Sequence, residues 1–160
     1  MKKIVYLLLL SLGWFTACTH RPTAVEQRRI EKHAQDSIAL LQQQRSLLFY
    51  QTQLDSLLPV SDSLIALFRY EKNDKYQDHG FYVTSRNNLR ILVQDDGTNL
   101  LLYRDGKRLP ETNTNLHGKE QDDLNRAQHL LVTIRDIREL EQRIQRTSLE
   151  IQKYQKRLNK

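Results

Sequence analysis

Two long helical patterns enclose a segment of alternating residues in this chain of 160 residues. The first runs from Ala24 to about Leu58 without glycine or proline, and its apolar residues recur at helical spacing. One row consists of Ile30, Ala34, Ile38, Leu41 and Leu48, and a neighbouring row of Leu40, Leu47 and Leu54 with Tyr50 and Leu57. We expect the two rows to form one narrow stripe that packs against another helix.

Pro59 interrupts this first pattern. Ser61 or Asp62 can cap a restarted helix, and an apolar face continues over residues 64–68. We expect either a kink at Pro59 or a second short helix, with helical structure ending near Glu71.

The apolar period changes from about 3.6 residues to 2 between residues 76 and 109. Strands are predicted over residues 79–84, 89–94 and 99–104, with a short strand over 107–109. Arg86-Asn87-Asn88, Asp96-Gly97 and Asp105-Gly106 predict the turns between them. We expect an antiparallel meander of three or four strands, with one apolar face covered by the adjoining helices.

A second long helix is predicted from about Lys119 to Leu158, after an acidic cluster that suits a helix N-terminus. Every seventh residue is apolar at Leu130, Ile137, Ile144, Ile151 and Leu158, with Thr133, Leu140, Thr147 and Tyr154 at the intervening positions. The predicted fold is α+β and mostly α. Two long antiparallel coiled-coil helices flank the small meander within one domain of residues 24–160.

The formal net charge of +6 is mild, and both signs are interspersed along the chain. We find no concentrated basic stripe with stacking aromatic residues, so the sequence does not indicate a nucleic-acid-binding protein. The single cysteine, Cys18, excludes an internal disulfide.

The N-terminus has the pattern of a secretory signal. Lys2 and Lys3 precede an apolar run over residues 4–14, which is too short to span a bilayer. Phe15-Thr16-Ala17-Cys18 resembles the lipobox of bacterial lipoproteins, with Phe15 in a position where leucine is usual. This resemblance implies that signal peptidase II recognises Phe15, Thr16 and Ala17, removes residues 1–17 and leaves Cys18 lipidated at the start of a linker, 18–23.

Two wider resemblances follow from the predicted architecture. The helix–β–helix order resembles prefoldin subunits, whose coiled-coil arms flank β hairpins. The lipobox, helices and small size together are similar to small coiled-coil lipoproteins of Bacteroidota, in which acidic residues soon after the cysteine accompany surface export. Here acidic residues are absent until Glu26, which implies a location in the cell envelope, on the outer membrane facing the periplasm.

Signals of catalysis are weak. The five histidines form no spaced metal pair, and no phosphate-binding loop or nucleophile motif is present. Asp95-Asp96-Gly97 suits a hairpin turn better than a calcium loop, because the further oxygen ligands are missing. We expect no enzyme activity, no metal and no cofactor.

The alternation of the strands places Leu101 and Tyr103 on the face opposite Leu100 and Leu102, where Tyr82 and Leu92 can join them. An exposed apolar patch there would be a contact surface for a partner. The first functional hypothesis is a membrane-anchored coiled-coil spacer or adaptor for an envelope protein or cell-wall partner. The alternative is a membrane-tethered, prefoldin-like holdase chaperone for envelope proteins, and the helices could pair within one chain or between copies.

Overall fold

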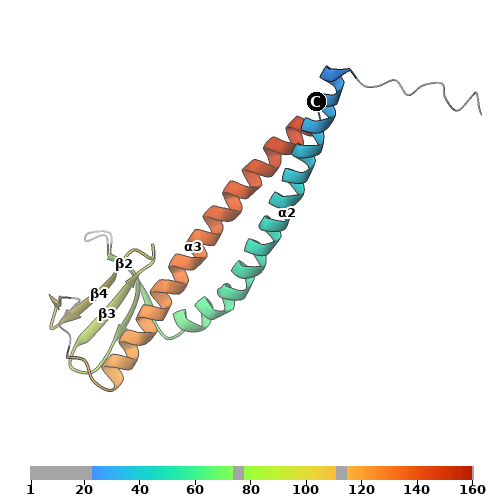
Figure 1. Cartoon of the computed structure of the whole chain (residues 1–160). Helices are drawn as coiled ribbons and strands as arrows, with labels where there is room; N and C mark the ends of the chain where they lie inside the picture. The colour runs from blue at the N-terminus through green and yellow to red at the C-terminus, as the bar shows by residue number, and fades with distance from the viewer. Residues whose placement is uncertain (1–22, 74–77, 111–114, 160) are drawn as a thin grey trace, which may run out of the picture.

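A computed structural model describes residues 23–73, 78–110 and 115–159. α2 (Ala24–Ile65) and α3 (Lys119–Leu158) lie side by side as a rod with the sheet at one end (Figure 1). At the other end the start of α2 lies beside the end of α3, where Arg157 and Asp36 form an ion pair of 3.6 Å. The two helices therefore run antiparallel, as the sequence predicted.

α2 begins at a capping box. The Thr23 hydroxyl accepts the Glu26 N–H at 3.3 Å, and the Glu26 carboxylate accepts the Thr23 N–H at 2.8 Å. The bond from the Thr23 N–H, and then a second bond of 3.0 Å that the Thr23 hydroxyl donates to the same carboxylate, lower the pKa of Glu26 below its ordinary value. The Thr23 cap agrees with the predicted start of the helix at Ala24.

α2 continues through Pro59 and ends at Ile65, so the alternative of a second short helix after Pro59 is wrong. The Ser63 hydroxyl donates to the Pro59 carbonyl at 2.8 Å, and Figure 1 shows α2 curving in its last turns. The predicted helical end near Glu71 is also wrong, because β1 (Arg69–Asn73) occupies those residues. β1 pairs with β2, and this backbone pairing overrides the local helical pattern.

The sheet is an antiparallel meander of five strands, in the order of the sequence. The strands after β1 are β2 (Asp78–Thr84), β3 (Leu89–Gln94), β4 (Leu100–Arg104) and β5 (Lys107–Arg108). These four agree with the predicted strands to within one residue at each end, and β1 is the strand that the prediction of three or four strands missed.

The turns adopt the backbone conformations that their sequences favour. Asn87 and Asn88 have φ of 58° and 54°, and Asp105 and Gly106 have φ of 50° and 75°. Asparagine, aspartate and glycine tolerate this left-handed region better than other residues, which is why these dipeptides are turn signals.

The turn between β3 and β4 packs directly on α3. The Arg135 guanidinium donates to the Gly97 carbonyl at 3.3 and 3.4 Å. On the same turn the Thr98 hydroxyl and backbone N–H donate to Asp96 at 2.6 and 2.9 Å. The Thr98 side chain is the main cause of a lowered pKa of Asp96.

The hydrophobic core lies between one face of the sheet and the first half of α3. Leu89, Ile91 and Val93 of β3 are fully buried, as are Ala127 and Leu130 of α3. Partly buried residues from the end of α2, the connection to β1 and the neighbouring strands surround them: Leu64, Ile65, Phe68, Phe81, Val83 and Leu100. The predicted covering of this sheet face by the helices is confirmed.

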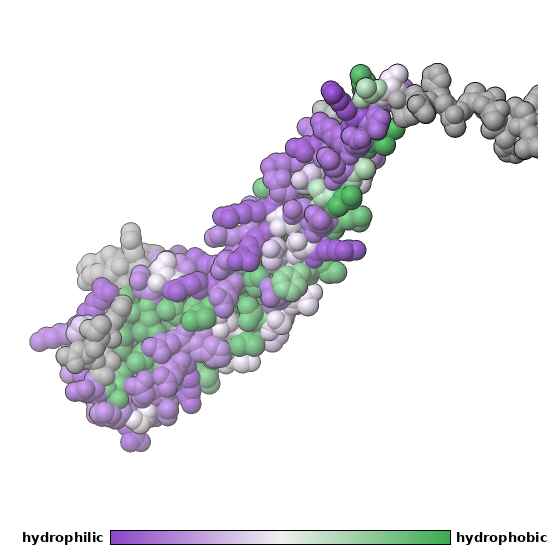
Figure 2. All heavy atoms as spheres, viewed as in Figure 1, coloured by the Kyte–Doolittle hydropathy of each residue, from purple (hydrophilic) through white to green (hydrophobic). Residues whose placement is uncertain are grey.

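The two apolar rows of α2 have different surroundings. Leu40, Leu47, Leu54 and Leu57 are partly buried at the contact with α3, which contributes Thr133, Leu140, Thr147 and Ile151. The other row, which we call the outer row, is exposed and consists of Ile30, Ala34, Ile38, Leu41 and Leu48. Figure 2 shows apolar side chains along the edge of α2 away from α3. The expectation of a single buried stripe is therefore wrong, because one neighbouring helix covers only one side of α2.

We predict that Gly97→Ala lowers the free energy of unfolding by about 2 kcal/mol, more than Gly106→Ala, for which we expect about 1 kcal/mol. Both glycines have positive φ, of 67° and 75°. A Cβ at Gly97 would also lie 3.1 Å from Ile134 Cγ2, whereas one at Gly106 meets nothing within 4 Å. Urea unfolding of both variants measures the difference, and equal losses would contradict the packing of this turn on α3.

Candidate functional site

Four residues predicted to contact a partner lie together on the sheet face away from α3. Tyr82, Leu92 and Leu101 are directly paired across β2, β3 and β4, and Tyr103 follows two residues after Leu101 on the same face. We call Tyr82, Leu92, Leu101 and Tyr103 the outer sheet face. The prediction that these four residues share one face of the sheet is therefore correct.

The exposure of the outer sheet face differs from the prediction. Leu92 and Leu101 are only 1% and 5% exposed, so the expectation of exposed leucines is wrong. Tyr82 and Tyr103 are partly buried and keep some accessible surface. The leucines occupy the centre of the face, and neighbouring residues of the same strands share that side of the sheet.

Arg90 is one of these neighbours. Its guanidinium lies 4.5 Å from the centre of the Tyr82 ring and forms an ion pair with Glu71 of β1. The accessible part of the face thus combines aromatic and arginine side chains, which are the types enriched in protein interfaces. Sequence reasoning missed Arg90 and Glu71 because β1 was not predicted.

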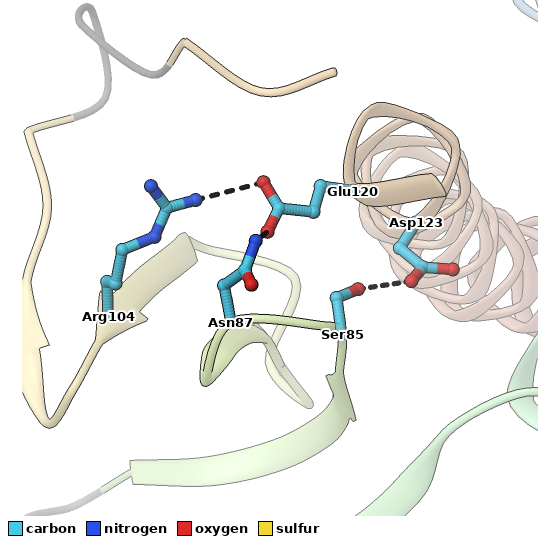
Figure 3. A network of polar contacts seen from close by, with 5 residues as sticks. All are labelled: Ser85, Asn87, Arg104, Glu120 and Asp123. Atoms are coloured by element: carbon cyan, nitrogen blue, oxygen red, sulfur yellow. Dashed lines mark hydrogen bonds and ion pairs between the residues drawn. The ribbon is translucent and has the colours of Figure 1, made fainter. Parts of the chain in front are cut away.

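A polar network joins the sheet to the start of α3 (Figure 3). The Ser85 hydroxyl donates to Asp123, and Arg104 and the Asn87 amide donate to the two Glu120 oxygens at 2.9 and 3.3 Å. Glu120 and Asp123 are 8% and 4% exposed. We call these five residues the polar clamp, since they hold a turn and a strand against one helix end.

The charges of the polar clamp suit its position. Both carboxylates lie in the first turns of α3, where the helix dipole favours negative charge. Each has hydrogen-bond donors, so two buried acidic groups are compatible with a stable fold. The sequence indicated the acidic helix start, but the partners are 16 to 38 residues away and needed the tertiary structure.

A cationic pocket of about 340 Å³ opens beside the polar clamp. Arginine, lysine, histidine and asparagine side chains dominate its lining, which comprises Arg86, Asn87, Arg104, Asn115, His117, Lys119 and Glu120. Donors of this kind suit an anionic group such as a carboxylate of a partner protein. Together with the outer sheet face, the pocket makes the sheet end of the rod the candidate site for partner contact.

The predicted lipidation site, Cys18, and the predicted recognition residues Phe15, Thr16 and Ala17 lie outside the described residues. The described chain begins five positions after Cys18, at the cap of α2. Lipidation therefore remains a prediction from the sequence.

We predict that Glu120→Ala lowers the free energy of unfolding by about 2 kcal/mol, because it leaves Arg104 and Asn87 without their acceptor. The effect is below that of a fully buried pair, since the Arg104 side chain is 36% exposed. Glu139→Ala is the matched control: its ion pair with Arg143 is exposed, and we expect a loss below about 0.5 kcal/mol. A similar loss in both variants, measured by urea unfolding, would contradict the role of the clamp.

Some kinds of site are absent from residues 23–73, 78–110 and 115–159. Among these residues no group of three or more His, Cys, Asp or Glu side chains could hold a metal ion. Neither α2 nor α3 combines the length and the apolar character that a membrane-spanning helix needs. Comparison with known proteins finds no match to this chain among protein-family profiles, curated proteins or solved structures.

Proposed function

We propose that this chain is a non-enzymatic lipoprotein of the bacterial cell envelope, anchored through Cys18. In this proposal the paired helices act as a spacer, and the sheet end is an adaptor for a protein or cell-wall partner. The chain faces the periplasm from the outer membrane. The signal pattern of residues 1–18 supports the anchor, and the positions of the two ends of the rod support the spacer.

The observation that carries the proposal is the position of the sheet at the end of the rod away from the start of α2. α2 starts six residues after Cys18, and the sheet lies at the other end of its 42 residues (Figure 1). At about 1.5 Å per residue, α2 extends roughly 63 Å. A lipid at Cys18 would thus hold the sheet end well away from the bilayer surface, where it can reach a partner.

The charges at the anchored end support the same orientation. Arg29, Lys32 and Arg157, with His33, line a depression of about 510 Å³ where α2 begins and α3 ends. The lining also includes Asp36, which pairs with Arg157. Basic residues near a bilayer are attracted to anionic headgroups, each by about 1 kcal/mol. This end is therefore suited to lie next to a membrane.

The packing of the helices favours the spacer over the tethered holdase. α2 and α3 contact each other along the rod, from the ion pair of Asp36 with Arg157 to the contact of Leu57 with the region around Leu140. A holdase that binds its clients between the two helices of one chain would need those helices apart. The adaptor is therefore the function that the geometry supports best.

We predict that the chain, expressed in bacteria, incorporates labelled palmitate and partitions into the detergent phase, because acyl chains add about 0.8 kcal/mol of membrane affinity per buried CH₂. The Cys18→Ala variant should lose the label, whereas the neighbouring Thr19→Ala variant should keep it. An unlabelled wild-type chain, or equal labelling of Cys18→Ala, would contradict the anchor.

A second prediction concerns the sheet end. A photo-crosslinking amino acid at position 82 or 103 should give a defined crosslinked species in intact cells, because Tyr82 and Tyr103 are the accessible members of the outer sheet face. The same amino acid at Leu149, which is 51% exposed on α3, is the control and should give none. Crosslinking at Leu149 alone would contradict the adaptor surface.

A further inference from the structure

The outer row gives α2 an unusual solvent-facing side. Ile38, Leu41 and Leu48 are 57%, 56% and 66% exposed, and Phe49 beside them is 58% exposed. Between Asp36 and Asp55 the only charged residue is Arg45. A helix face that is meant only for water normally carries many charged residues, so this surface has the character of an interface.

α3 provides the comparison within the same rod. Its exposed side carries ion pairs such as Arg143 with Glu139 and Lys153 with Glu150, three or four residues apart. This is the usual surface of a solvated helix. The two helices have similar lengths, 42 and 40 residues, so the lack of charge belongs to α2 specifically.

The spacing of the exposed residues on α2 is that of a coiled-coil seam. Steps of four and three residues alternate along Ala34, Ile38, Leu41, Arg45, Leu48 and Thr52. The residues that face α3, such as Leu40, Leu47 and Leu54, fall at other heptad positions. The outward seam therefore matches another helix with the same repeat, and α3 of the same chain does not occupy it.

We propose that a second copy of this chain covers the outward seam, with the two α2 helices parallel and in register. A parallel two-fold axis brings each seam residue next to its own equivalent, so apolar residues meet apolar residues. The positions that flank the seam are uncharged: Gln35, Ser37, Gln42, Gln44, Phe49, Gln51 and Ser56. The flanks of two such faces do not repel each other, and within the seam Arg45 is the residue that meets a like charge, at a cost in stability.

Arg45 determines the register of the two α2 helices, and the anchor determines that they are parallel. A single polar residue in such a seam favours two strands and one register, and its long side chain can reach water. The parallel direction rests on the proposed function, because lipids at Cys18 place every copy with α2 pointing away from the same membrane. The seam from Ala34 to Thr52 is only about 27 Å long, so the dimer relies on the high effective concentration of anchored copies.

The test uses the full chain in its native membrane, with one cysteine introduced at Leu48 or at Leu149. Leu48 lies in the seam, whereas Leu149 is exposed on α3. Mild oxidation should convert most of the Leu48→Cys chain, and little of the Leu149→Cys chain, into a disulfide-linked dimer, since parallel seam positions meet the distance limits of a disulfide. Equal crosslinking of the two variants, or none at Leu48, would overturn the dimer.

The chain without an introduced cysteine distinguishes a failure of the proposed anchor from a failure of the proposed dimer. If Cys18 carries lipid, this chain cannot form a disulfide. Oxidation of the unmodified chain to a dimer through Cys18 would contradict the anchor. An unmodified chain that stays monomeric on oxidation, together with equal crosslinking of Leu48→Cys and Leu149→Cys, would contradict the seam alone.

A second measurement tests whether unfolded clients, instead of a second copy, occupy the seam. The mass in mild detergent should fall from two copies to one in the Leu41→Asp, Leu48→Asp double variant, and should stay at two copies in Leu149→Asp. Both variants should keep their helical circular dichroism, because the changed residues are exposed. A single-copy wild type that suppresses aggregation of an unfolded client through Leu41 and Leu48 would assign the seam to clients and overturn the second copy.

Discussion

The contact of α3 with the apolar face of the sheet is the interaction on which the rest of the structure depends. β3 contributes Leu89, Ile91 and Val93 without exposed surface, and α3 contributes Ala127 and Leu130. A small meander is not stable alone, and this contact supplies its missing layer. The same stripe of α3 then continues toward the C-terminus and contacts α2. One helix therefore fixes both the position of the sheet and the side of α2 that becomes buried.

Most of the fold could be predicted because it follows from local patterns. β2 and β3 have apolar residues at alternate positions, turns that favour positive φ separate the strands from β2 to β5, and α3 has a heptad repeat with an acidic start. β1 could not be predicted, because its residues follow an apolar helical face and become a strand only by pairing with β2. The outer row of α2 was misassigned for a related reason. Periodicity shows that a face is apolar, but only the position of α3 shows which face is covered.

The sequence predicted which residues of the candidate site lie together on one sheet face, but it did not predict how exposed they are. Strand register placed Tyr82, Leu92 and Leu101 together, since residues opposite each other share a face. The burial of the leucines was not predictable, because alternation shows that they lie on the face away from α3 and does not show whether that face is covered. The polar clamp was not predictable beyond its acidic helix start, because each hydrogen bond to Glu120 or Asp123 from the sheet joins distant segments.

The proposed anchor and the proposed dimer bear on each other through the geometry of α2. A helix with apolar residues on two opposite sides would associate in several orientations if it diffused freely in solution. The proposed lipid, six residues before the helix, would remove most of these orientations and leave the copies parallel. Under this constraint a short seam with a single charge, Arg45, is sufficient to specify one partner. Pairing of two rods would also place two sheet ends side by side, so that a partner could contact two adaptor surfaces at once.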